Sequence, residues 1–219
     1  MERAHRLTTR RLGVIAAATA LAMMVPIAPA HADYAPYHTV SYSAPKGDAN
    51  VEGLVAEPSL DVTGVSIGYN NKYLRFTMDL VDPSPNPPTG FQQQDFIWRF
   101  SYGSPKVQVL VELSQFALFG QFDPDYIGYT DRGADTVGVC KKCYATVNMA
   151  KHRVEFYTSL DDFNSALSSA FTSGKTPPTL RPKAVLTVLE ADTQVDVGPG
   201  LQAFPVDTAV APSHLTFTV

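Results

Sequence analysis

Apolar and polar residues alternate most regularly between residues 59 and 82. In the second half of this stretch every other residue is apolar: Leu74, Phe76, Met78 and Leu80. The first half carries a similar set around Gly64, where the alternation shifts, and a lone glycine in a strand often marks a β-bulge. Asn70 and Asn71 lie between the halves and tolerate the left-handed backbone of tight turns. The pattern predicts a β-hairpin with one buried face.

A second hairpin follows, with an aromatic first strand. Aromatic residues occupy alternate positions from Phe96 to Tyr102, and valines alternate with mostly polar residues from Val107 to Leu113. Trp98 lies in the aromatic series and has two interpretations, a core residue or a stacking platform for sugar rings. We favour the core, because alternating aromatic side chains usually fill the interior of a sandwich.

Shorter patterns complete the chain. An edge strand and a loop are expected in residues 33–58, a proline-rich loop in 82–90 and strands near 151–156, 184–189 and 215–219. Ser159 and Asp162 form a capping box before apolar residues at helical spacing, which predicts an amphipathic helix over about 159–172, ended by Gly174. The fold class expected is all-β, an antiparallel jelly-roll-like β-sandwich with one short helix.

Residues 1–32 have the pattern of an export signal. Arginines precede an apolar run from Leu12 to Val25, and Ala30-His31-Ala32 is a small-residue cleavage site, so the mature chain should begin at Asp33. Thr9-Arg10-Arg11-Leu12 resembles a twin-arginine signal, which leaves both the Sec and twin-arginine routes open. The alternative, a membrane anchor, is disfavoured because the apolar run is short. Residues 59–219 then form a single sandwich domain after the 33–58 segment.

The net charge of the mature chain limits which kinds of partner it can bind. The leader holds four of the 17 basic and one of the 21 acidic residues, so the mature chain has a formal charge of −7. A chain this acidic is a poor match for nucleic acid or for an anionic membrane surface. We therefore expect a secreted, extracellular protein whose partner is a polysaccharide or a cell-surface protein.

The stretch 114–135 combines aromatic and acidic residues. Its aromatic side chains are candidates for ligand binding: Phe116, Phe119, Tyr126 and Tyr129. Its carboxylates are candidates for calcium, which prefers oxygen ligands: Asp123, Asp125, Asp131 and Asp135. EF-hand spacing is absent from the sequence, and the alternative is a solvated acidic loop. We expect no cofactor unless calcium binds at these carboxylates.

Cys140 and Cys143 flank a two-residue turn and should oxidise after export. The ends of a two-residue hairpin loop lie near the separation that a disulfide needs, so a structural disulfide at a hairpin end is predicted. A thioredoxin-like redox pair would need the first cysteine at a helix N-terminus, whereas strand-like residues follow here. A zinc site would need two further ligands at metal spacing.

The order of these elements resembles the sandwich domains of the DOMON and family-9 carbohydrate-binding-module type. The residues that carry the resemblance are Leu60-Asp61-Val62 to Ile67, Lys72 to Met78, Phe96 to Tyr102 and Val107 to Val111, within residues 59–157. The resemblance implies a jelly-roll-like sandwich that binds sugars, haem or no known ligand. Haem-binding members use methionine and histidine ligands, but Met78 lies on the apolar face, where core packing is expected. The helix departs from the family pattern.

Three classes of function follow. The first is a secreted, non-catalytic β-sandwich binding module, for which carbohydrate is the candidate ligand. The second is a cell-surface structural or interaction protein without a small ligand. The third is a hydrolase, for which the sequence offers carboxylate pairs at Asp123 and Asp125 or at Asp161 and Asp162, but no G-x-S-x-G elbow.

Overall fold

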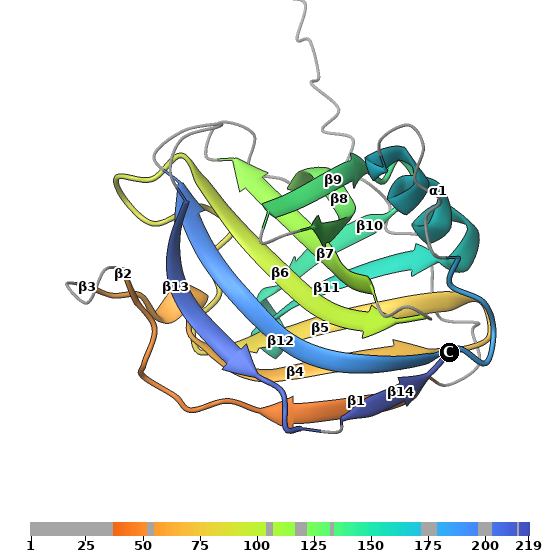
Figure 1. Ribbon diagram of the computed structural model, residues 1–219. Helices are drawn as coiled ribbons and strands as arrows, with labels where there is room; N and C mark the ends of the chain where they lie inside the picture. Colours follow the sequence, from red (N-terminus) through yellow and green to blue (C-terminus); the bar gives the residue numbers. More distant parts are fainter. Residues whose placement is uncertain are drawn as a thin grey trace, which may run out of the picture. The chain divides into compact units, whose positions relative to one another are not determined.

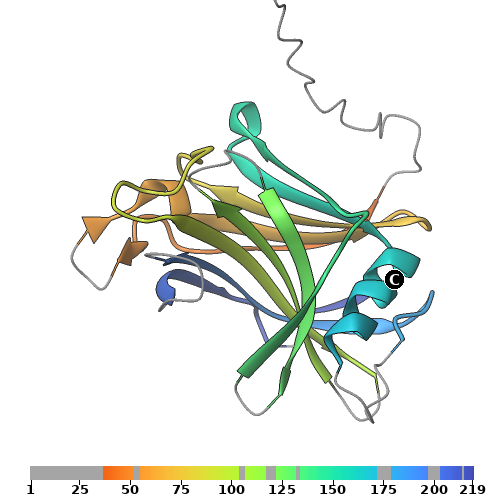
Figure 2. The same ribbon diagram turned by 90° about the horizontal axis from the view of Figure 1, so that it is seen from above.

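The computed structural model describes residues 37–51, 55–103, 107–116, 122–131, 134–171, 179–196, 203–213 and 215–219. Residues 35–219 form one compact unit. Its strands build two antiparallel sheets that face each other, with one α-helix beside them (Figures 1 and 2). This confirms an all-β sandwich with a single short helix.

The first sheet has five strands in the order β1-β4-β5-β11-β10. Their bounds are His38–Ser43 (β1), Val62–Tyr69 (β4), Tyr73–Leu80 (β5), Arg153–Ser159 (β11) and Tyr144–Asn148 (β10). The second sheet follows the order β13-β12-β6-β7-β8-β9, and β14 pairs with β12. Their bounds are Ala203–Val210 (β13), Val185–Asp196 (β12), Gln93–Tyr102 (β6), Val107–Phe116 (β7), Phe122–Asp131 (β8), Ala134–Val139 (β9) and Thr216–Thr218 (β14). The short strands β2 (Asn50–Val51) and β3 (Val55–Ala56) pair with each other beside the 3₁₀ turn η2 (Pro58–Leu60).

The predicted hairpin is β4–β5, and its details follow the sequence. The pairing shifts between Val62 and Gly64, which confirms the bulge. Asn71 has a φ of 69°, in the left-handed region, and Asn70 Oδ1 accepts hydrogen bonds from the backbone N–H groups of Lys72 and Tyr73. These hydrogen bonds from the backbone to the Asn70 side chain stabilise the turn that aligns the two strands.

Aromatic rings from both sheets fill the interior. Phe76 is fully buried, and its ring centroid lies 5.7 to 6.1 Å from those of Trp98, Phe100 and Phe156. Trp98 is 1% exposed, which confirms the core interpretation and excludes this side chain as a sugar platform. Met78 is also fully buried in the same cluster, as expected.

The helix α1 (Leu160–Ala170) begins as predicted. Ser159 Oγ accepts from the backbone N–H of Asp162 at 3.1 Å, which completes the N-cap. The helix ends at Ala170, before the predicted end, and packs against β8 and β9. A Cβ atom at Gly138 of β9 would collide with Ser169 and with the carbonyl of Ala166, so only glycine allows this approach.

Two strands were missed because they contain proline. Residues 122–131, expected in an acidic loop, form the inner strand β8, and β13 had no counterpart among the expected elements. Pro124 lies where the β7–β8 pairing shifts, and Pro205 lies where the β12–β13 pairing shifts. Pro124 has no paired residue on β7, whereas Pro205 pairs with Gln194 beside the shift but lies on the edge strand β13, where proline is tolerated.

The prediction of a hairpin around the cysteines is wrong. β9 pairs with β8 in the seven-stranded sheet, whereas β10 pairs with β11 in the five-stranded sheet. The turn from Cys140 to Cys143 therefore crosses from one sheet to the other. The two cysteines do lie at disulfide distance, with 5.5 Å between their Cα atoms, so the pairing itself stands.

Candidate functional site

The aromatic residues expected to bind ligand do not gather on one open surface in the described part of the chain. Tyr129 is 5% exposed and stacks on Phe171 of the helix end, with 3.9 Å between ring centroids. Tyr126 is partly exposed on β8. Phe119 and the side chain of Phe116 lie outside the described residues. Ligand binding by this stretch stays a prediction.

The acidic residues expected to bind calcium also stay untested. Asp123, Asp125 and Asp131 lie on β8 and Asp135 on β9, but the structure describes only their backbone.

The outer face of the five-stranded sheet brings together a set of side chains that the sequence did not single out. Arg75 on β5 is paired with Tyr157 on β11, and Tyr157 is paired with Tyr144 on β10. Directly paired residues of antiparallel strands point to the same side of a sheet. These three side chains therefore form one line across three strands, on the side opposite to Phe76.

Tyr37 extends this line. Arg75 on β5 pairs with Gly68 on β4, and a Cβ atom at Gly68 would approach the Tyr37 ring to 3.2 Å. The ring therefore covers the place that a side chain at position 68 would occupy. The guanidinium carbon of Arg75 lies 4.5 Å from the centroid of the same ring, within cation–π distance. We call Tyr37, Arg75, Tyr157 and Tyr144 the tyrosine–arginine row.

The row is partly exposed along its length. The rings of Tyr144 and Tyr157 have centroids 6.1 Å apart and planes tilted by 35°. Neighbouring strands lie about 4.8 Å apart, so the row from β4 to β10 spans about 14 Å. That length exceeds a single small ring and suits an extended ligand.

Polar groups lie within the row and next to it. Burial raises the pKa of Tyr157, and the Glu155 carboxylate adds to this rise while the Arg75 guanidinium opposes it. The phenol therefore stays protonated at neutral pH and is a hydrogen-bond donor. Thr77 pairs with Glu155 and lies beside Arg75 on the same face. Within the described chain, no group accepts from Arg75 Nε and none bonds to Thr77 Oγ1.

This face offers binding groups rather than an acid–base pair. The Arg75 guanidinium can donate strong, oriented hydrogen bonds to hydroxyl groups, and tyrosine rings present flat apolar surfaces. The Glu155 carboxylate is 7% exposed and is hydrogen-bonded to the Tyr157 side chain. The second carboxylate of the face, Asp79, is held by Arg153 at 2.8 Å. Periodicity placed Arg75 on the outer face, but it carried no information about which strands flank β5.

A second polar group lies on the outer side of the seven-stranded sheet. Asp95 is 3% exposed and accepts a hydrogen bond from Gln93 Nε2 at 2.8 Å. Burial, followed by the Glu112 carboxylate, raises the pKa of Asp95 to about 7. A carboxyl group that retains its proton near neutral pH has the chemistry of a general acid. Its burial in the described structure separates it from solvent, however, which favours a role in packing.

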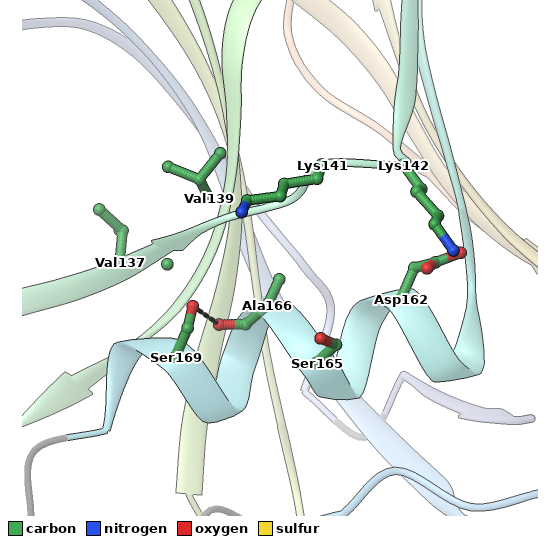
Figure 3. Close-up of a pocket in the computed structure, with 9 residues that line it drawn as sticks. Val137, Val139, Lys141, Lys142, Asp162, Ser165, Ala166 and Ser169 are labelled. Carbon is green, nitrogen blue, oxygen red and sulfur yellow. Dashed lines mark hydrogen bonds between the residues drawn. The ribbon is translucent and has the colours of Figure 1, made fainter.

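A hollow of about 570 Å³ lies between β9, the cysteine turn and α1 (Figure 3). Lys141 and Lys142 border it from the turn, and Asp162 and Ser169 from the helix. The side chains of Lys142 and Asp162 point toward each other (Figure 3). Because Asp162 also accepts from the Ser159 hydroxyl at 2.6 Å, this carboxylate is part of the helix cap. The hollow has a mixed apolar and polar lining, and it lacks the convergent aromatic groups of the tyrosine–arginine row.

Comparisons with protein-family models, curated proteins and solved structures find no match. Among the helices that the structure describes, none is long and apolar enough to cross a membrane.

Proposed function

We propose that the protein is an exported, non-catalytic binding module that holds an extended carbohydrate chain across the tyrosine–arginine row. The observation that carries the proposal is the pairing of Arg75 with Tyr157 and of Tyr157 with Tyr144, which aligns their side chains across three strands. Export is supported by the leader pattern of residues 1–32 and by the cysteine pair at disulfide distance.

The chemistry of the row suits sugars. The faces of pyranose rings carry apolar C–H groups that pack on aromatic side chains, and their edges carry hydroxyl groups. In the proposed complex, Tyr144 and Tyr157 pack against consecutive sugar rings. Arg75 donates hydrogen bonds to hydroxyl oxygens at the ring edges. The mature chain is acidic, so neutral polysaccharides are the preferred ligand class over polyanions.

A glycan array followed by calorimetry with the purified protein tests the proposal. Tyr157→Ala and Tyr144→Ala should each weaken binding about fivefold to tenfold, since a stacked aromatic contact contributes about 1 kcal/mol or more. Tyr126→Ala is the matched control, because Tyr126 is a partly exposed tyrosine on a strand of the other sheet.

Three outcomes separate the alternatives. If Tyr157→Ala and Tyr144→Ala lose binding while Tyr126→Ala binds as the parent does, the tyrosine–arginine row is supported as the binding site. Loss in Tyr126→Ala alone would move the site to the aromatic stretch 114–135. A protein that retains no polysaccharide would overturn the proposal and favour a cell-surface interaction protein without a small ligand.

A further inference from the structure

Three carboxylates from distant parts of the chain converge away from the tyrosine–arginine row. Ligand oxygens of Asp48, Asp61 and Asp207 all lie within 4.8 Å of one another. Asp61 and Asp207 are 3% and 8% exposed, whereas Asp48 is exposed. The cluster therefore joins two buried carboxylates and one exposed carboxylate.

The fold holds the three residues from both sheets. Asp48 lies between β1 and β2, Asp61 between η2 and β4, and Asp207 on β13 at the point where its pairing with β12 shifts. β13, an edge strand of the seven-stranded sheet, contacts β4 of the five-stranded sheet. A bulge redirects the side chains beside it, which accounts for the inward position of a carboxylate on an edge strand.

Backbone donors orient two of the carboxylates. Asp207 Oδ2 accepts from the N–H of Val62 at 2.7 Å, and its Oδ1 accepts from the N–H of Thr208 at 2.7 Å. Asp61 Oδ2 accepts from the N–H of Gly47 at 2.8 Å. The carboxylates are therefore held in place before any ion arrives.

One buried oxygen of these three residues has no hydrogen-bond partner in the described chain. Asp61 Oδ1 is buried, and no donor in the described residues reaches it. A buried carboxylate oxygen without a donor is costly, and native structures satisfy such atoms with protein groups, water or ions. The charges of Asp48 and Asp61 also act on Asp207, whose pKa is raised first by burial and further by these two neighbours. The unsatisfied oxygen and the mutual repulsion both point to a positive charge.

We propose that Asp48, Asp61 and Asp207 bind one Ca²⁺ ion. The donor set consists of oxygen atoms, which hard divalent cations prefer. Ligands on opposite sides of a Ca²⁺ ion lie about 4.6 to 5.2 Å apart, so one ion can contact three oxygens with the observed separations. The ion fastens the 44–49 loop to the start of β4 in one sheet and to β13 in the other. This site is independent of the proposed carbohydrate binding and differs from the predicted site at Asp123, Asp125, Asp131 and Asp135.

Calorimetry and thermal melts of the purified protein, stripped with EDTA, test this site. CaCl₂ up to about 10 mM covers the range of weak extracellular sites. We expect saturable binding of one ion per chain and a rise in Tm, because an ion that binds only the folded state stabilises it. Sodium chloride at matched ionic strength should give no such rise.

Two variants locate the ion. Asp61→Asn keeps the side-chain shape and should weaken Ca²⁺ binding about tenfold or more. Without calcium it should melt no lower than the parent, since one of three repelling charges is gone. Asp48→Asn changes an exposed residue, so folding is preserved, and it should weaken binding in the same way. The combination of Asp123→Asn with Asp125→Asn is the control and should bind as the parent does.

The proposal is overturned if the parent binds no Ca²⁺ up to the highest concentration, or if Asp48→Asn and Asp61→Asn bind as tightly as the parent. Loss of binding in the Asp123 and Asp125 control alone would place the ion on β8 and also overturn it.

Discussion

The indole Nε1 of Trp98 donates a hydrogen bond to the backbone carbonyl of Thr77, 3.3 Å away. Trp98 lies on β6 of one sheet and Thr77 on β5 of the other, so this bond joins the two sheets inside the core. Its donor is satisfied in a buried site, as a core tryptophan requires. The same arrangement turns Phe76 inward and leaves Arg75 on the outer face, where the proposed ligand would lie.

Phe76→Ala should lower the free energy of unfolding by about 3–5 kcal/mol, the usual cost of truncating a buried aromatic ring. Phe76 is fully buried and contacts three other rings, so the cavity cannot collapse easily. Urea melts followed by Trp98 fluorescence measure the loss. Arg75→Ala and Thr77→Ala should cost well under half as much, because both side chains lie on the side of the sheet opposite to the aromatic core and neither removes a ring, although Thr77 is 2% exposed. Equal losses in Phe76→Ala and Arg75→Ala would show that the strand register is wrong.

Replacing Cys140 and Cys143 together by serine should lower stability by about 2 kcal/mol or less, because the ring closed by the disulfide is very small. Mass spectrometry of the exported protein, alkylated without reduction, should find no free thiol. A doubly alkylated product would contradict the disulfide. A much larger loss of stability would mean that the link between the two sheets depends on this bond.

Secreted protein should begin at Asp33, since Ala30-His31-Ala32 is a small-residue cleavage site after the apolar run. N-terminal sequencing of protein from culture supernatant checks this directly. A product that retains residues 12–25 would contradict cleavage and favour the membrane anchor.

Stability should fall as the pH rises from about 4 to about 7. Burial raises the pKa of Asp95 to about 7, so the folded state holds a proton that the unfolded chain has released over this range. Asp95 therefore favours the folded state less at pH 8 than at pH 5, by at most about 3 kcal/mol, because about two units of the raised pKa lie within this window. Asp95→Asn should flatten this part of the profile in urea melts at both pH values. An unchanged pH difference in the variant would assign it to other groups, such as Asp196 or Asp207, whose pKa values burial also raises.

The local sequence pattern correctly predicted those features of the fold that depend only on residues close together in the chain. Strict alternation identified the inward side of β5 and β6, because successive side chains of a strand point to opposite faces. Ser159 and Asp162 located the start of α1, since a capping box is formed within four residues. Gly64 marked the bulge in β4 for the same reason. The strands with proline at irregular positions were missed, because the proline interrupts the pattern while the sheet accommodates it.

The sequence by itself determined which side chains of the regularly alternating strands enter the core, as on β5 and β6, and only the tertiary structure decided which of the other side chains meet. Tyr144 and Arg75 share one row because β11 lies between their strands, and nothing local specifies that order. The local sequence likewise does not specify that the turn from Cys140 to Cys143 joins two sheets rather than two paired strands. Asp48 and Asp207 approach each other because an N-terminal loop meets an edge strand near the C-terminus. Periodicity reports the environment of each residue, whereas strand order and sheet packing arise from contacts distant in sequence.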